Sequence, residues 1–280
     1  MTNIRPISAS TSTVKLQKAL AQAGLGSRRE MEQWISAGRV TVNGVKARLG
    51  ARVGASDEVK VDGRLVRAAV SSRLPQVLLY HKPEREIVSR DDPAGRPSVF
   101  DKLPRLRGAK WVAVGRLDFN SCGLLVFTTS GELANRMMHP SHELEREYAV
   151  RVLGTLTEGQ TARLLSGIQL DDGVARCDSV VPEGGEGANR WYRLVLKEGR
   201  NRIVRRLFEA LGLRVSRLMR VRFGPVALPP RLRRGQTLEL GPAETRQLLT
   251  ALGMPAPAPP RGGARGSAGT HRRHRAFRAR

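Results

Sequence analysis

The 280-residue chain contains little that could build a disulfide, a metal centre or a membrane span. Its two cysteines, Cys122 and Cys177, form no C-x-x-C arrangement, and its five histidines show no ligand spacing, so we expect no disulfide and no metal. No apolar run approaches the ~20 residues that span a bilayer, and the N-terminal segment lacks the apolar core of a signal peptide. We therefore expect a cytoplasmic protein that does not bind membranes.

Acidic residues are also scarce. The chain carries 25 Asp and Glu against 49 Lys and Arg, which leaves a formal net charge of +24. Such a surplus creates a positive field that attracts polyanions, and nucleic acid is the first candidate among them. The hydrophobic content of 40% is ordinary for a folded protein, and the length is sufficient for one or two domains with their own cores.

Two short helices and a hairpin are predicted within residues 14–70. The segment Val14–Gly26 places its apolar residues on one helical face before a glycine ends the helix. Ser27 and Glu30 form a capping-box pattern that starts a second short helix. A run of alternating valines then leads into Asn43-Gly44, which is a strong hairpin signal.

Arg28 and Arg29 lie at the start of the second predicted helix, where backbone N–H groups bind phosphates well. A merely solvated basic face is the alternative reading. However, K-L-Q-K-A-L-A-Q-A-G-L-G-S-R-R-E and G-R-V-T-V-N-G resemble segments of the S4 RNA-binding domain, over about Lys15 to Val61. The resemblance implies RNA binding and no chemistry.

Residues 77–250 are predicted to form a second, α+β domain behind a linker at residues 71–76. Strands and helices intermingle, and most strands are expected to pair without crossovers, in a mixed and largely antiparallel sheet with a central cleft. Thr129 and Glu132 are expected to cap a helix. Predicted strands are Val77–Tyr80, Gly123–Phe127, Tyr148–Val152, Tyr192–Leu196 and Val221–Phe223, and predicted helices end at Met138, Ser166 and Leu211.

Both ends of the chain are predicted to be disordered. The leader, residues 1–13, is rich in Ser and Thr. The tail, residues 251–280, is mostly Pro, Ala, Gly and Arg from Pro255 onward, with seven arginines and no acid from Arg261. Such a composition cannot bury a core, so we interpret the tail as a basic, disordered segment.

One carboxylate, Asp118, stands out in the stretch V-G-R-L-D-F-N-S-C-G. An aspartate beside Asn and Gly commonly starts a turn, and that is the simpler interpretation. Tyr148 shares a strand face with Val150 and Val152 and should therefore point inward, either as a core residue or as the wall of a site.

A third group of candidates lies in E-G-R-N-R-I-V-R-R-L-F-E-A-L-G. Here Val204, Leu207 and Phe208 form a buried helical stripe, Arg205 flanks that stripe and Arg206 faces away from it. From Arg200 to Arg222 the sequence has eight arginines and a single acid. These arginines would repel one another without a polyanion nearby, which indicates a surface that binds RNA.

Four sequence runs of the second domain resemble motifs of bacterial pseudouridine synthases. The family they resemble is the one named after small-subunit pseudouridine synthase A. The four runs are K-P-E-R-E-I-V-S-R-D-D-P-A-G-R-P-S-V-F, G-R-L-D-F-N-S-C-G-L-L, R-E-Y-A-V and E-G-R-N-R-I-V-R-R-L. With the S4-like module, the resemblance covers about residues 14–242. With the S4 module and the G-R-N-R form of the last motif, the chain most resembles the members of this family that act on large-subunit ribosomal RNA, so the resemblance implies 23S ribosomal RNA as the substrate.

The resemblance implies a role for individual residues. Asp118 would be the catalytic aspartate, Tyr148 the aromatic that packs on the target base, and Arg205 the basic partner of Asp118. Lys82 would belong to the motif that supports the floor of the active site. The residues expected to bind substrate are Arg116, Lys82, Arg202, Arg28 and Arg29.

The chemistry of uridine isomerisation fits these residue types. The C1'–N1 bond must break, the uracil must turn, and C5 must join C1', so the base has to leave its stack at a cost of a few kcal/mol. An aromatic wall replaces that stacking, and a carboxylate acts either as a nucleophile or as a base toward C2'. The uracil is both leaving group and returning nucleophile, so no cofactor and no metal is needed.

The sequence departs from the family's usual residues in two places. Ser121-Cys122 stands where the family often has Thr-Ser, and Arg85 stands where it often has Gly. Both departures lie outside the reacting groups, so we expect them to affect the detail of substrate recognition and not the chemistry.

The expected partner is ribosomal RNA or an assembly intermediate of the large subunit, bound by a monomer. One alternative is a non-catalytic assembly or translation factor that only binds structured RNA, which would explain the charge equally well. Another is the same enzyme acting on small-subunit ribosomal RNA or transfer RNA. The target uridine depends on RNA shape, which the sequence does not spell out.

Overall fold

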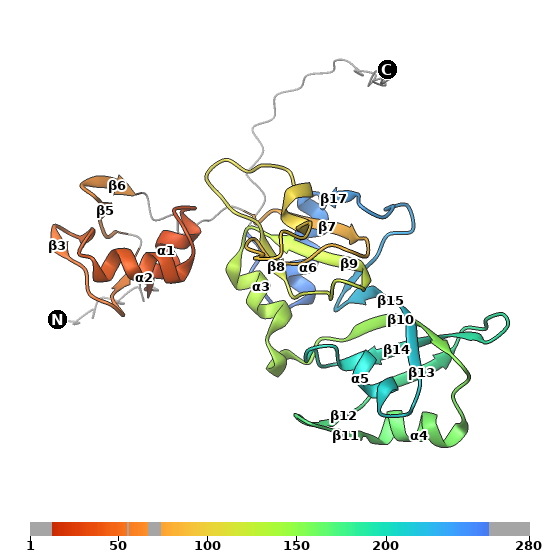
Figure 1. Cartoon of the computed structure of the whole chain (residues 1–280). Coiled ribbons are helices and arrows are strands. Elements are labelled where there is room, and N and C mark those ends of the chain that lie inside the picture. The colour runs from red at the N-terminus through yellow and green to blue at the C-terminus, as the bar shows by residue number, and fades with distance from the viewer. Residues whose placement is uncertain (1–12, 55, 67–73, 258–280) are drawn as a thin grey trace, which may run out of the picture.

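The computed structural model describes residues 13–54, 56–66 and 74–257 (Figure 1). The predicted leader lies outside the described residues except for Thr13, as do half of the predicted linker and the tail beyond residue 257. Within the described ranges, none of the helices has the length and apolar character needed to cross a membrane.

The N-terminal module packs two helices against a small sheet. Helices α1 (Leu16–Gln22) and α2 (Arg28–Ser36) match the predicted positions. Four strands pair antiparallel in the order β3-β2-β5-β6, and β1 pairs with β4 beside them. The strands are β1 Val14–Lys15, β2 Val40–Val42, β3 Val45–Lys46, β4 Arg52–Val53, β5 Val59–Val61 and β6 Arg64–Val66.

The predicted local signals of this module are confirmed. The Ser27 hydroxyl accepts a hydrogen bond from the Glu30 backbone at 3.1 Å, and the Glu30 carboxylate accepts one from the Ser27 backbone at 3.1 Å. Between β2 and β3, Asn43 has a φ of 51° and Gly44 a φ of 82°. Both lie in the left-handed region that a two-residue hairpin turn requires.

The second domain is built on one sheet of nine strands. Its main path is β13-β14-β10-β15-β9-β7-β17, with β16 paired to β15 and β8 paired to β9, and every pair except β15 with β9 is antiparallel. The strands are β7 Val77–Lys82, β8 Val112–Val114, β9 Cys122–Thr128, β10 Arg146–Leu153, β13 Ser179–Pro182, β14 Asn189–Leu196, β15 Arg214–Phe223, β16 Val226–Ala227 and β17 Thr237–Glu239. The predicted α+β, largely antiparallel fold is confirmed.

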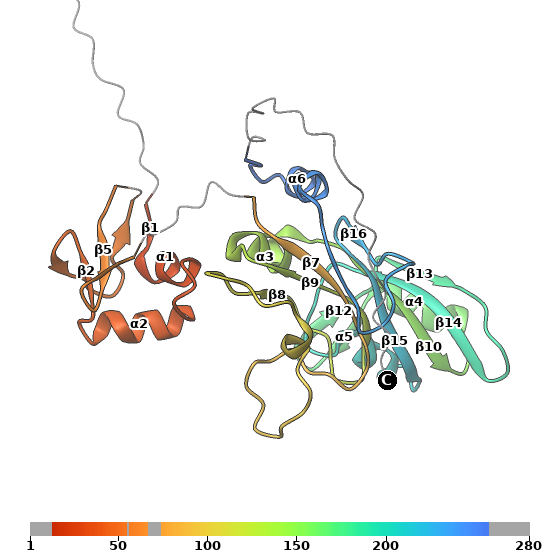
Figure 2. The same cartoon turned by 90° about the horizontal axis from the view of Figure 1, so that it is seen from above.

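The sheet has two halves, each with its own core. Around β7 and β9, Leu124, Val126 and Phe223 pack with helices α3 and α6, whereas Val150, Leu194 and Leu218 pack with α4 and α5. Figures 1 and 2 show the two helix pairs beside their respective halves. The helices are α3 Gly131–Met138, α4 Glu158–Ser166, α5 Ile203–Glu209 and α6 Pro242–Ala251, with short 3-10 turns η1 Val99–Lys102 and η2 Pro140–His142, and a small hairpin of β11 Ile168–Leu170 and β12 Gly173–Ala175.

Strands β9 and β15 join the two halves over a very short seam. Only two residue pairs define their parallel register, Cys122 with Met219 and Gly123 with Arg220. A Cβ on Gly123 would overlap the Arg220 carbonyl oxygen and lie 2.6 Å from the Arg220 nitrogen, and the φ of 108° also disfavours a side chain. Glycine is therefore required here because the two backbones approach too closely for any other residue.

Three sequence predictions need correction. The cap of α3 is Ser130, whose hydroxyl accepts from the Leu133 backbone, and not Thr129, because the helix begins only at Gly131. Strand β15 begins at Arg214 and is much longer than predicted, because it pairs with β10 from Arg214 to Phe223. Ordered packing also continues past residue 250, since Leu252 is buried and its carbonyl accepts a hydrogen bond from Arg136.

The seam yields a stability prediction. Gly123→Ala should lower the free energy of unfolding of the second domain by about 2–5 kcal/mol, because its Cβ overlaps fixed backbone atoms as well as adopting an unfavourable φ. Gly235→Ala in the same domain is the matched control: its φ is 78°, but nothing lies within 4 Å of the added Cβ, so the cost should be about 1 kcal/mol. Denaturant unfolding of both variants gives the comparison, and equal losses would contradict the close approach.

Candidate active site

A large cleft opens on the sheet where its two halves meet. It has a volume of about 1380 Å³, above the roughly 300–1,000 Å³ of ordinary small-molecule pockets. Four of the predicted site residues line it: Arg116, Asp118, Tyr148 and Arg202. The cleft thus gathers a carboxylate, an aromatic ring and several arginines from distant parts of the sequence.

Asp118 lies in the loop that leads from β8 into β9. The Ser121 backbone N–H donates to the Asp118 carbonyl at 3.1 Å, and the Ser121 hydroxyl lies 3.5 Å from Oδ2. Asp118 therefore does shape a turn, as the simpler interpretation of the sequence holds. Its half-buried side chain nevertheless faces the cleft, so the turn also presents the carboxylate.

Lys82 is the anchor of this loop. Its side chain is fully buried, and Nζ donates to the carbonyl oxygens of Pro83, Asp118 and Ser121 at 2.9–3.1 Å. The prediction that Lys82 supports the floor fits this position. The prediction that it binds substrate does not, because a fully buried ammonium engaged with three carbonyls does not reach the cleft surface.

Arg205 holds the same loop from the other side. It lies on α5 and is buried, and its guanidinium donates to the Asn120 carbonyl at 2.8 Å and to the Val215 carbonyl at 3.1 Å. Burial lowers the pKa of Arg205, and the negative charge of Asp118 partly opposes that shift. The expected direct ion pair is not formed, since no contact within 4 Å joins the two side chains among the described residues.

Tyr148 and Arg220 form the opposite wall of the cleft. Tyr148 lies on β10 and points inward, as strand alternation predicts, and its cross-strand neighbour on β15 is Arg220. Arg220 donates from Nε to the Leu124 carbonyl on β9 at 2.9 Å. Complete burial lowers the pKa of Arg220, and its interactions with Tyr148 oppose that shift.

Sequence reasoning missed Arg220 as a site residue. The available signal was its spacing of two from Leu218, which places a charge on the inward face of a strand. The predicted strand began only at Val221, so Arg220 fell outside it. In the structure it lies opposite Tyr148 on the neighbouring strand, and its side chain binds the β9 backbone across the seam between the two halves.

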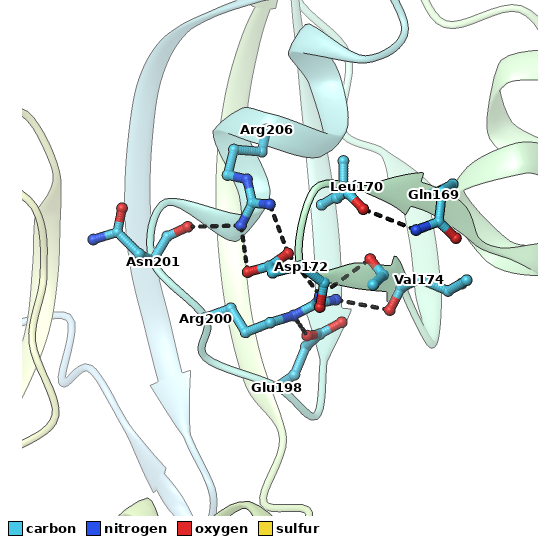
Figure 3. Close-up of polar contacts among 9 residues, drawn as sticks. Gln169, Leu170, Asp172, Val174, Glu198, Arg200, Asn201 and Arg206 are labelled. Carbon is cyan, nitrogen blue, oxygen red and sulfur yellow. Dashed lines mark hydrogen bonds and ion pairs between the residues drawn. The ribbon is translucent and has the colours of Figure 1, made fainter.

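The arginine-rich segment is neutralised to a larger extent than its sequence indicates. Carboxylates from elsewhere in the fold pair with Arg200, Arg206 and Arg222, and Glu209 pairs with Arg202. Figure 3 shows one such network, in which Asp172 binds both Arg200 and Arg206. Four of the eight arginines are therefore paired with carboxylates within the chain, so the mutual repulsion in this segment is weaker than its sequence indicates.

The departures at positions 85, 121 and 122 have a structural reading. Arg85 adopts a φ of 69°, in the left-handed region, which explains why a glycine is favoured at this position. Its backbone N–H donates to the Phe119 carbonyl at 2.7 Å, in the loop that carries Asp118. Ser121 and Cys122 are both buried, and burial raises the pKa of the Cys122 thiol to about 11.

Arg28 and Arg29 lie apart from this cleft. Both are exposed in the first turn of α2, as the capping pattern predicts, and neither lines the cleft. They belong to the N-terminal module, so any contact they make with a ligand is separate from the chemistry at Asp118.

Comparison with known proteins gives the same two-part division. Residues 76–210 match a family described as RNA pseudouridylate synthase, and residues 14–59 match the S4 domain. Proteins named "Ribosomal large subunit pseudouridine synthase B" from Shigella flexneri and Salmonella typhi are 54% and 55% identical over 244 residues, covering 86% of this chain and 84% of theirs. The motifs indicated the family named after small-subunit pseudouridine synthase A, whereas these relatives are named as large-subunit type B enzymes.

Among solved structures, one described as "Crystal structure of pseudouridylate synthase" superposes with a TM-score of 0.58. It is 27% identical and covers 84% of this chain and 99% of its own. The similarity therefore extends over both the N-terminal module and the sheet that carries the cleft.

Lys82 generates a pH prediction. Burial lowers its pKa to about 8, against 10.5 for an ordinary lysine, so the unfolded chain retains a proton that the folded state loses in this range. The free energy of unfolding of the wild type should therefore rise, relative to Lys82→Met, between pH 8 and about pH 10. Below pH 8 the difference between the two proteins should be constant. Denaturant unfolding at a series of pH values tests this, and a difference that never changes with pH would mean that Lys82 titrates normally.

Proposed function

Because this chain belongs to the RNA pseudouridylate synthase family, we propose that it converts a uridine of large-subunit ribosomal RNA into pseudouridine. The observation that supports this most directly is the cleft, where Asp118 and Tyr148 face one space from opposite halves of the sheet. The large-subunit substrate is proposed from the names of the relatives that share more than half of their aligned residues with this chain.

The cleft supplies what the reaction needs. A uridine turned out of its stack gains the Tyr148 ring as a replacement surface, and the Asp118 carboxylate reaches the sugar. The C1'–N1 bond then breaks, the uracil turns and C5 joins C1'. C5 loses its proton and N1, now free of the sugar, gains one. Asp118 serves either as the nucleophile at C1' or as the base toward C2'.

Positive charge completes the proposed substrate site. Arg116 and Arg202 line the cleft and are exposed, so an RNA phosphate can contact Arg116 directly and can compete with Glu209 for Arg202. The S4 module, with Arg28 and Arg29 at a helix N-terminus, is proposed to dock structured RNA without taking part in the chemistry. We propose that the chain acts as a monomer, in the cytoplasm, on ribosomal RNA or on an assembling ribosomal particle.

Asp118→Asn is the sharpest test of this proposal. The loop contacts of Asp118 that involve its backbone carbonyl, to Lys82 and Ser121, survive the substitution, so the loop should keep its shape. Pseudouridine formation should nevertheless fall to background, because the amide is neither a nucleophile nor a base. RNA affinity should stay level or increase, since a carboxylate beside phosphates repels them.

The assay is quantification of pseudouridine in ribosomal RNA incubated with each purified protein, with circular dichroism and thermal melting as controls for folding. If the folded variant retained more than a few per cent of wild-type activity, Asp118 would be only a turn residue. If the wild type itself formed no pseudouridine but bound the RNA, the alternative of a non-catalytic assembly factor would be supported instead.

Deletion of residues 1–70 tests the docking role of the S4 module. The deletion should weaken RNA binding and lower kcat/KM on intact ribosomal RNA, because the module supplies affinity and no reacting group. The second domain has its own cores and should remain folded. Unchanged kcat/KM in the folded deletion variant would remove the docking role.

A further inference from the structure

The β11–β12 hairpin contacts the segment of residues 198–202, which lines one edge of the cleft. The turn between β11 and β12 carries Asp172, whose carboxylate accepts hydrogen bonds from Arg206 at 2.9 and 2.6 Å and from Arg200 at 2.9 Å (Figure 3). Arg206 lies on α5, and Arg200 lies in the loop that precedes it. One carboxylate thus ties together three separate elements of the fold.

Arg200 makes the connection rigid. The same guanidinium donates to the backbone carbonyls of Asp172, Gly173 and Val174 at 2.8–3.1 Å, and Nε donates to the Glu198 carboxylate. It therefore follows the backbone of the hairpin turn over three consecutive residues. A planar guanidinium that engages both a carboxylate and several carbonyls has little freedom to move.

The segment held in this way forms part of the cleft. Residues 198–202 all line it, and Arg202 has a φ of 50°, in the left-handed region. A non-glycine residue in that region is strained and persists only where its surroundings fix it. The brace from the hairpin supplies such surroundings immediately before Arg202.

We propose that Asp172 is a positioning residue, which acts through Arg200 and Arg206 to hold residues 198–202 so that Arg202 meets the RNA substrate. This inference rests on the proposed function. Asp172 itself stays outside the cleft lining and contacts no reacting group. On this proposal the β11–β12 hairpin fixes the position of residues 198–202 at the edge of the cleft.

Simple electrostatics predicts the opposite effect for loss of this carboxylate. The hydrogen bonds from Arg206 hold the pKa of Asp172 at about 2, so it is negatively charged at neutral pH. Removing a negative charge near an RNA-binding cleft should strengthen RNA binding. If Asp172 positions the rim, its removal should weaken binding although the net charge becomes more positive.

Asp171 offers a matched control. It is the adjacent residue, it is exposed, and it forms no ion pair within the part of the chain that the structure describes. Asp171→Asn and Asp172→Asn change the net charge equally and at almost the same place. Any difference between them therefore reports the contacts of Asp172 and not its charge.

The experiment measures binding and turnover of a large-subunit ribosomal RNA fragment by the full chain and both variants, over a range of salt concentrations. Asp172→Asn should raise Kd and KM by about 3–10-fold while kcat changes little, because an orienting contact is lost and the reacting groups remain. The slope of log Kd against log salt concentration should decrease by about one, the amount expected for the loss of one phosphate contact. Asp171→Asn should bind as well as the wild type or better.

Asp172→Glu is a third variant, which keeps the negative charge and should recover part of the affinity lost in Asp172→Asn. Thermal melting verifies folding of each protein. Equal binding by Asp171→Asn and Asp172→Asn would overturn the positioning role. Failure of the proposed function has a different signature, because the wild type would then form no pseudouridine, whereas the binding comparison between the two variants would still be readable.

Discussion

Two buried cations fix the loop that carries Asp118, and the site depends on them. Lys82 binds the carbonyls of Asp118 and Ser121 from below, and Arg205 binds the carbonyl of Asn120 from α5. Each cation is held by backbone oxygens, so neither needs a carboxylate partner to remain in the interior. The result is positive charge close to Asp118 without an ion pair that would occupy its oxygens.

Much of this arrangement follows from local sequence signals. The caps at Ser27 and the turn at Asn43-Gly44 are determined by side chains within a few residues of each other, and the inward position of Tyr148 follows from strand alternation. The carboxylate of Asp118 is likewise identified by the residues around it. Where the deciding contacts are short in sequence, the structure agrees with sequence reasoning, except that the cap of α3 is Ser130 and not Thr129.

The remainder depends on contacts between distant segments. The loop carbonyls that Lys82 and Arg205 bind, those of Asp118, Ser121 and Asn120, lie between 36 and 85 residues away along the chain. The acids that pair with Arg206 and Arg222 likewise come from distant segments, the β11–β12 turn and the start of β10. Arg220 escaped notice because the length of β15 is set by its pairing with β10. Periodicity does not report such pairings, so charge counted along the sequence overstates the charge that remains free in the fold.

The short seam at Gly123 has a mechanical consequence. Asp118 belongs to one half of the sheet and Tyr148 to the other, and the backbones of β9 and β15 pair there through only two residue pairs. Side chains cross the same boundary: Arg220 donates to the Leu124 carbonyl, Arg205 donates to the Asn120 carbonyl, and Phe223 packs into the core of the β7 and β9 half. The distance between the carboxylate and the ring is therefore set by this small group of contacts. An RNA that contacts both halves would strain these contacts. The fit of the substrate and the alignment of the Asp118 carboxylate with the Tyr148 ring would therefore change together.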